Sequence, residues 1–421
     1  MADSTLPPDL PDLVMQQIIL RLPTKPAIRM SSLSKQWEGI WSALRVLDFK
    51  EGDLPQDDDD ANDKHAKFIN ILVRYLEFRK KEKQQPLLDK LTLHMRYLFG
   101  DEDAIICKLL SNSLDRNVKE LDISLKSKQQ EVECCYCLSR TVLMKAKYLT
   151  TLKMEYLRIK EIESAETEPL CPSLKTLFVK TVHFDNKALF YLVSGCPAVE
   201  YLSLTSCSFD TYVLHVSSCS LRKLAVKNCD VENIEVDKYM NLESFTFISK
   251  FPLLQSISLV DTINLNHIKI RAQQLTYLGL FGCHDQLNAT VNTPSLHHLD
   301  IHAHLTAKVS VKSPNLWLAR ITLEEQELST LNWSWKYFAT FCDFLTPFCS
   351  KNIILVIRDL KAIIFPAENF KSACYPPFPG TNRLRLILSN PPTEDSDISD
   401  LEESLLWMAP NAEEMAYAQF E

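Results

Sequence analysis

The sequence predicts an α/β protein in three parts: an N-terminal bundle of three helices, a curved solenoid of strand repeats, and a C-terminal α/β capping module. Three observations lead to this fold class. An apolar pattern of helical period fills residues 9–44 and is interrupted by prolines. Leucines then recur as Leu-x-x-Leu-x-Leu through most of the chain. After residue 322 this recurrence stops, and longer helical and strand patterns take its place.

The N-terminal helices carry more large apolar side chains than they can bury among themselves. Pro11 suits the first turn of a helix, where its missing N–H needs no partner. Val14, Ile18 and Leu22 follow every four residues and form one stripe. Two shorter helices fit the residues up to 44, and the last contains Trp37. Since a segment of roughly 40 residues usually needs outside support to fold, this surplus predicts a docking surface.

The same segment resembles the F-box in its plant form. The resemblance rests on a Leu-Pro pair before the first helix, a second Leu-Pro pair at its end, and a Leu and a Trp at the matching later positions. It implies an F-box over residues 5–49 that binds a Skp-family adaptor and, through it, a cullin scaffold. By this matching, the adaptor contacts are expected at Leu10, Pro11, Ile18, Leu22, Pro23, Leu33 and Trp37.

Composition excludes several other classes of protein. The chain has 421 residues, of which 46% are hydrophobic, so it can bury a large core. Only 7 glycines argue against phosphate-binding loops, and a net charge of −8 gives no general footprint for nucleic acid. No apolar run predicts a membrane span or a secretory signal. The 13 cysteines are therefore expected to be thiols in the cytoplasm or nucleus, and no cofactor is expected.

Residues 50–89 are predicted to be a linker followed by a helix. The run Asp57-Asp58-Asp59-Asp60 is typical of a solvated segment. Apolar residues at helical spacing then predict a helix over residues 64–81, which ends in a basic run where a helix C-terminus favours cations.

Residues 90–322 are predicted to form leucine-rich repeats, in which one strand cannot bury its apolar side chains alone but a stack of turns can. Complete matches begin at residues 199 and 221, and nearly complete ones at 149 and 174. In these turns Cys207 and Cys229 are expected to be small buried residues. Shorter matches begin at residues 91, 118, 242, 254, 275 and 296.

The spacing of the repeats changes along the chain. Starts at 149, 174 and 199 are 25 residues apart and leave room for a helix at 185–194, whereas later starts lie 21 or 22 apart. Extra apolar pairs, such as Ile234 with Val236 and Ile268 with Ile270, predict a second short strand in the later turns. The start at 254 follows only 12 residues after that at 242, and its register stays unresolved.

Residues 323–421 depart from the repeat and are predicted to cap it. We expect an aromatic-rich helix over 325–345, strands over 352–358 and 383–388, an acidic loop over 394–400 and a last helix. The order of F-box, repeats and this end module resembles plant proteins that join an F-box to leucine-rich repeats and an FBD-type domain.

Strand alternation nominates a recognition surface on the inner curve of the solenoid. Residues between the core leucines are expected to face a target protein, with anchors at Phe178, Tyr201, Lys223, Tyr277, His298 and Asp300. His298, Asp300 and His302 would then lie together, an arrangement that also suits zinc. We favour a solvated polar face over a metal site.

These features predict a binding protein without a catalytic centre of its own. The chain would be the substrate-recognition subunit of a cullin-based ubiquitin ligase, holding the adaptor at one end and an unidentified target along the repeats. Three alternatives stay open at this point: a scaffold or decoy outside ubiquitin transfer, a small-molecule receptor of the same broad class, and a metallohydrolase centred on His298.

Overall fold

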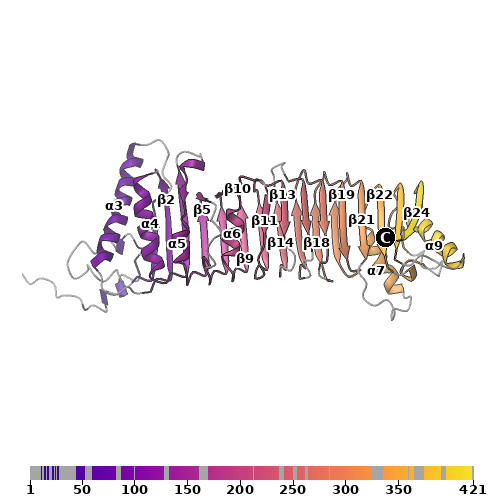
Figure 1. The fold of residues 1–421 in the computed structure, drawn as a ribbon, viewed down its shortest axis with the longest axis horizontal. Coiled ribbons are helices and arrows are strands. Elements are labelled where there is room, and N and C mark those ends of the chain that lie inside the picture. The colour runs from indigo at the N-terminus through magenta and orange to yellow at the C-terminus, as the bar shows by residue number, and fades with distance from the viewer. Residues whose placement is uncertain are drawn as a thin grey trace, which may run out of the picture. The chain divides into compact units, whose positions relative to one another are not determined.

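The computed structural model of the chain divides into two compact units, Met1–Val199 and Glu200–Glu421, called unit 1 and unit 2 below. It describes residues 11, 14–15, 17–18, 21–22, 24, 26–27, 44–52, 59–81, 87–98, 100–127, 132–160, 169–211, 213–236, 241–249, 254–260, 264–283, 285–323, 335–358, 360–364, 374–389 and 395–419. The chain is α/β, and its sheets are built of parallel strands, as the sequence predicts (Figure 1).

Unit 1 contains a parallel sheet whose apolar residues align from strand to strand. Leu47 pairs with Leu91, Leu91 with Leu121, and Leu121 with Leu152, and all four are buried. This ladder places the leucines of the repeat in one core row. The strands, in spatial order, are β1 (Val46–Lys50), β2 (Lys90–Tyr97), β3 (Glu120–Ser127), β5 (Thr151–Glu155) and β7 (Thr176–Lys180).

Helices follow β1 and β2 and lie side by side in unit 1 (Figure 1). They are α3 (Asp59–Lys81) and α4 (Asp101–Leu114), and α3 confirms the helix expected over 64–81. It begins earlier than expected, so Asp59 and Asp60 of the expected linker belong to the helix. A smaller ladder and shorter helices complete the unit: η2 (Val132–Cys134), β4 (Tyr136–Cys137), α5 (Arg140–Met144), β6 (Leu157–Ile159), β8 (His183–Phe184) and α6 (Ala188–Ser194). The last of these lies within the helix expected at 185–194.

A buried histidine joins both helices to the sheet of unit 1. His65 on α3 contacts Glu51 through Nδ1 at 2.9 Å and Glu102 on α4 through Nε2 at 2.5 Å. Glu51 also accepts hydrogen bonds from the backbone N–H and the Nε of Arg96 at the end of β2. Burial alone would lower the pKa of His65, but the hydrogen bonds to Glu102 and Glu51 outweigh it and raise the pKa to about 9. His65 is therefore an imidazolium held between two carboxylates.

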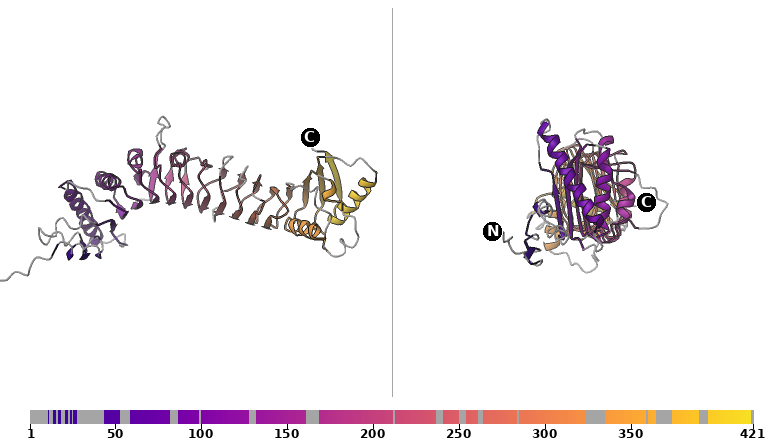
Figure 2. Two further views of the ribbon diagram at one scale, coloured as in Figure 1. Left: turned by 90° about the horizontal axis from the view of Figure 1, so that it is seen from below. Right: turned by 90° about the vertical axis from the view of Figure 1, so that its left-hand side faces the viewer.

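Unit 2 is built from two parallel sheets in which the chain alternates between one sheet and the other. The first contains β9 (Tyr201–Thr205), β12 (Lys223–Lys227), β14 (Ser244–Ile248), β16 (His267–Arg271), β18 (Asn288–Asn292) and β20 (Lys308–Lys312). The second contains β11 (Val213–Val216), β13 (Asn233–Val236), β15 (Ser256–Leu259), β17 (Tyr277–Leu280), β19 (His298–Ala303) and β21 (Leu318–Leu323), and continues through the last strands of the chain. Figure 2 (left) shows these turns following one another along unit 2.

The irregular start at residue 254 marks a change of sheet. Leu242 precedes β14 in the first sheet, whereas Leu254 precedes β15 in the second. The Leu-x-x-Leu-x-Leu pattern thus passes from one sheet to the other, and the paired residues Ile268 and Ile270 belong to the first. The second strand per turn is confirmed, but the expectation that the strong pattern stays on one face is wrong. Once both strands of a turn are buried alike, the pattern no longer distinguishes them.

The C-terminal residues extend the second sheet. Parallel pairing runs from β21 through β22 (Asn352–Ile357) and β23 (Arg383–Leu388) to β24 (Glu414–Gln419), which confirms the two expected strands. The aromatic helix is α7 (Trp335–Leu345), with Phe338 and Phe341 buried, and residues 325–334 of its expected range lie outside the described residues. From Asp395 onward the acidic segment is not a loop, because α9 (Asp395–Met408) already contains it, and Asp397 then lies in the first turn, where the helix dipole favours a carboxylate. A short turn, η4 (Leu360–Ala362), follows β22.

The residue after several strands has a left-handed backbone. The φ angle lies between 50° and 57° at the residues that directly follow β5, β7, β9 and β12, which are Tyr156, Thr181, Ser206 and Asn228. The thiols of the following Cys207 and Cys229 lie 3.6 and 3.5 Å from carbonyls two residues back, and both side chains are buried as expected. The chain therefore turns sharply after each of these strands. In the described part of the chain, no helix has the length and apolar character needed to cross a membrane.

The charged histidine predicts a pH-dependent stability of unit 1. Because its folded pKa is raised to about 9, His65 contributes stability that is complete below about pH 6.5 and is lost as the pH rises through 9. We expect the unfolding free energy to fall by up to about 3 kcal/mol over this range. His65→Gln should lose that pH dependence, whereas exposed His297→Gln should keep it. Thermal unfolding at pH 6.5 and pH 9 makes the comparison, and equal slopes in both variants would refute the assignment.

Candidate functional site

The predicted recognition residues do not share one face. Phe178 lies on β7 in unit 1, and Tyr201 and Lys223 lie on the first sheet of unit 2. Tyr277 lies on β17 and His298 and Asp300 lie on β19, both in the second sheet. The expectation of a single inner face is wrong, and its cause is the change of sheet near residue 254. That each residue contacts a target stays a prediction.

The second sheet of unit 2 brings Tyr277, His298 and Asp300 together. Tyr277 is directly opposite His298 on the neighbouring strand, and Gly279 is opposite Asp300. A Cβ at Gly279 would lie 2.6 Å from the Phe281 ring and 2.9 Å from the Tyr277 hydroxyl. Only glycine therefore lets both rings approach the strand here, at the position opposite Asp300.

Asp300 is held in a setting that opposes its charge. Burial raises the pKa of Asp300, and the nearby Arg320 and His302 only partly offset that effect. Arg320 is the cross-strand neighbour of Asp300 on β21. Within the described residues, Asp300 Oδ1 and Arg320 Nε are buried without a hydrogen-bond partner. A buried acceptor and a buried donor in this state gain free energy when a ligand supplies the missing bonds.

Aromatic rings surround this pair. His302 packs edge-on against Phe281 at 4.9 Å between ring centroids, and His298 packs in the same manner against Trp317 at 5.8 Å. Trp317 is 52% exposed, which is high for a residue type that anchors protein interfaces. Trp317 and Arg320 could not be predicted from the sequence, because Ala319 occupies the position where the repeat pattern has a leucine.

The suggested zinc trio does not converge. His302 Nε2 lies 4.0 Å from Asp300 Oδ1. Among the described residues, however, His298, Asp300 and His302 do not bring one ligand atom each within 4.8 Å of one another. The rings of both histidines pack against aromatic side chains instead.

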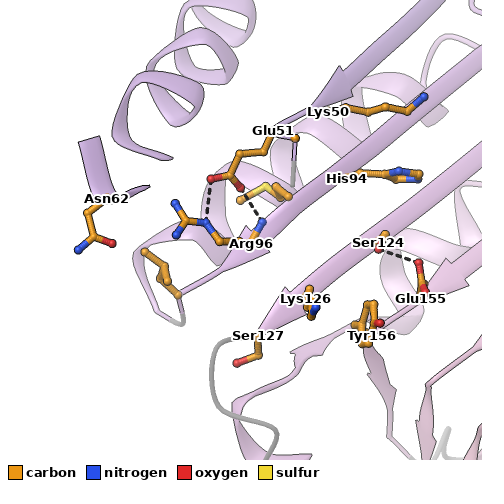
Figure 3. Close-up of a pocket in the computed structure, with 13 residues that line it drawn as sticks. Lys50, Glu51, Asn62, His94, Arg96, Ser124, Lys126, Ser127, Glu155 and Tyr156 are labelled. Carbon is orange, nitrogen blue, oxygen red and sulfur yellow. Dashed lines mark hydrogen bonds and ion pairs between the residues drawn. The ribbon is translucent and has the colours of Figure 1, made fainter. Parts of the chain in front are cut away.

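A second candidate is a hollow of about 440 Å³ in unit 1, at the carboxyl ends of β1, β2, β3 and β5 (Figure 3). Its charged side chains already have partners within the fold. Arg96 donates to Glu51, Ser124 donates to Glu155 at 3.0 Å, and the Lys126 ammonium lies 5.9 Å from the centre of the Tyr156 ring. These pairings hold the strand ends together and leave little for a ligand to gain.

Comparison with known proteins identifies two regions. Residues 7–49 match the F-box domain family, and residues 107–252 match the family described as FBD-associated F-box protein At5g56370, LRR repeats. The resemblance to plant F-box proteins with leucine-rich repeats is thereby confirmed.

Several proteins of Arabidopsis thaliana are similar to this chain. The putative FBD-associated F-box protein At5g22720 is 29% identical over 254 residues, covering 57% of this chain and 50% of that protein. The F-box/FBD/LRR-repeat protein At2g26030 is 26% identical over 286 residues, covering 63% and 60%. The putative FBD-associated F-box protein At5g56690 is 32% identical over 197 residues, covering 46% of each. The chain thus spans about half the length of these relatives.

The described part of the F-box leaves an apolar stripe partly bare. Val14 is 43% exposed, Ile18 and Leu22 are half-buried, and Met15 beside them is buried. Pro11 is exposed, whereas Leu10, Pro23, Leu33 and Trp37 of the expected adaptor contacts lie outside the described residues. The three-helix arrangement of the F-box therefore stays a prediction. Thr24 ties the segment to the sheet, since its Oγ accepts a hydrogen bond of 2.7 Å from the Asp48 N–H.

Asp300 and Asp122 provide a matched test of the cluster on the second sheet. Burial also opposes the charge of Asp122 on β3, but a hydrogen bond with His94 and nearby cations lower its pKa. The charged form of Asp122 therefore stabilises the fold, whereas that of Asp300 costs stability at neutral pH. We expect Asp122→Asn to lower local stability by about 1–2 kcal/mol and Asp300→Asn to leave it unchanged or raise it. Hydrogen exchange resolved for β3 and β19 measures both, and a loss in β19 equal to that in β3 would contradict the prediction.

Proposed function

We propose that this chain is a substrate-recognition subunit of a cullin-based ubiquitin ligase. In this role the F-box binds a Skp-family adaptor, the adaptor links it to the cullin, and the repeats bind a target protein. The observation that carries the proposal is the F-box match at residues 7–49 together with the partly exposed stripe of Val14, Ile18 and Leu22. An apolar stripe left open on a helix favours a helical partner.

The target is proposed to bind the outward residues of the repeats. We propose one such contact region on the second sheet, formed by Tyr277, His298, Asp300, Trp317 and Arg320. It combines an exposed aromatic anchor with two polar groups that lack hydrogen-bond partners among the described residues. Phe178, Tyr201 and Lys223 are offered as further contacts on other strands.

We assign the chain no chemical step. Its proposed contribution is proximity, because holding a target near a ubiquitin-charged enzyme raises the effective concentration of the target lysines. We place this activity in the cytoplasm or nucleus, in agreement with 13 cysteines that are all thiols in the structure.

Charged substitutions on the exposed stripe test adaptor binding. We expect Val14→Asp with Ile18→Asp to abolish co-purification with a Skp-family adaptor, because a carboxylate on the stripe would be buried unpaired against the partner. Gln17→Asp, on an exposed neighbouring position, adds one such charge off the stripe and should leave binding intact. Circular dichroism of each variant confirms that the repeats remain folded. Undiminished adaptor capture by the double variant would refute the proposed F-box surface.

A scaffold or decoy acting outside ubiquitin transfer is the second candidate. Affinity capture of the full chain with the proteasome inhibited distinguishes the two. We expect cullin and ubiquitin-modified protein to be recovered along with the adaptor. Recovery of the adaptor without cullin would favour the scaffold.

A further inference from the structure

The first sheet of unit 2 presents a face whose only charged side chains are cations. On β12, β16 and β20 the sequence reads Lys-Leu-Ala-Val-Lys, His-Ile-Lys-Ile-Arg and Lys-Val-Ser-Val-Lys, and the residues between the outward positions are largely buried. Alternation therefore places the first, third and fifth residue of each strand on the outward face. The six cations there are Lys223, Lys227, Lys269, Arg271, Lys308 and Lys312.

No described carboxylate neutralises these cations. The outward positions of the intervening strands β9, β14 and β18 carry Ser, Thr, Asn, Ile and Tyr, and none carries Asp or Glu. None of the six cations has an ion pair with a described residue. Unit 1 differs, because there Lys180 pairs with Glu155 and His94 pairs with Asp122 across the same kind of strand ladder.

The spacing of the cations limits their mutual repulsion. They occur on every second strand, so the rows that cross the sheet place one charge about every 10 Å. One outer row contains Lys227, Arg271 and Lys312, and the other contains Lys223 and Lys308 with His267 between them. Lys269 is the one cation of the middle row, two residues from Arg271 on β16. At about 10 Å, which is close to the Debye length at physiological salt, repulsion between exposed charges is largely screened. The face is stable without a partner and still attracts an anionic one.

We propose that this face binds an extended, carboxylate-rich segment of a protein, which on the proposed function is part of the target. A row of single cations about 10 Å apart suits acidic side chains spaced along an extended chain. The Ser, Thr and Asn side chains between the rows supply hydrogen bonds to its backbone. Charge complementarity of this kind increases the rate and the selectivity of association.

Two features favour a protein carboxylate over a phosphate or a nucleic acid. Five of the six cations are lysines, and the six are distributed over three strands, whereas phosphate groups are typically recognised by converging arginines. The outward positions carry no aromatic residue except Tyr201 on the first strand, so the face has no platform on which successive bases stack.

The face ends at β20, the last strand of the first sheet, where residues of β18, β20 and α7 line a hollow of about 440 Å³. Thr290, Lys308 and Ser310 line one side, and Asp343 and Phe344 of α7 line the other. Asp343 is exposed and brings a negative charge to this end. An acidic segment is therefore expected to lie across β12 to β20 and to end short of α7.

Fluorescence anisotropy with a labelled peptide of alternating Glu and Ser tests the proposal on the full chain. We expect salt-sensitive binding that weakens at least about ten-fold in the variant Lys227→Glu, Arg271→Glu, Lys312→Glu. A matched variant, Lys147→Glu, Lys160→Glu, Lys187→Glu, makes the same change in net charge at exposed positions of unit 1 and should bind as the unaltered chain does.

Three results would overturn the proposal: no binding of the acidic peptide at low salt, an equal loss in both triple variants, or tighter binding of a single-stranded oligonucleotide or a phosphopeptide of the same charge. Adaptor capture is measured on the same samples and is expected to be unchanged in both. A failure of peptide binding with normal adaptor capture would leave the F-box proposal standing, and the reverse result would refute that proposal alone.

Discussion

The fold of both units depends on one constraint, the pairing of each parallel strand with the strands of adjacent turns. A strand here has no hairpin partner, so its backbone N–H and C=O groups are satisfied only by neighbouring turns in the stack. The register is fixed by buried rows such as Leu47, Leu91, Leu121 and Leu152, since a slip by one residue would turn those side chains outward. With the inward positions committed to the core, recognition is left to the outward positions and to the turns.

This constraint explains which parts of the fold were predictable. A stack repeats its apolar spacing in the sequence, so the main repeat strands, the second strand of the later turns and the larger part of α3 followed from periodicity. β1, α4 and β24 were not predicted. The sheet to which a strand belongs could not be predicted, because buried strands of the two sheets have the same apolar pattern. The short step from Leu242 to Leu254 therefore did not reveal that the pattern changes sheet. The His65 cluster was also beyond reach, since its partners Glu51 and Glu102 lie 14 and 37 residues away in the chain.

Only part of the candidate site could be predicted from the sequence. Alternation correctly grouped Tyr277, His298 and Asp300. It could not predict the burial that raises the pKa of Asp300 or the close approach of Phe281 and Tyr277 to Gly279, because both depend on side-chain packing in the folded protein. The cationic face had a readable signal that was missed: a basic residue at both ends of three five-residue strands. The signal has meaning only when those strands share one sheet, and the change of sheet concealed that.

The two outward faces of unit 2 differ in how they keep polar groups available for a partner. On the second sheet, Asp300 and Arg320 are partly withdrawn from solvent, so each orphaned atom costs stability in the free protein and a bond from a partner recovers that cost. On the first sheet, the cations remain in water and are spaced widely enough that the free protein loses little. At Asp300 and Arg320, only a well-fitted partner that supplies the missing hydrogen bonds gains binding free energy. The cationic face of the first sheet instead attracts any suitably spaced acidic chain, and salt weakens that attraction. Since the whole chain has a net charge of −8, the concentration of cations on one sheet is a property of the strand order and not of the composition.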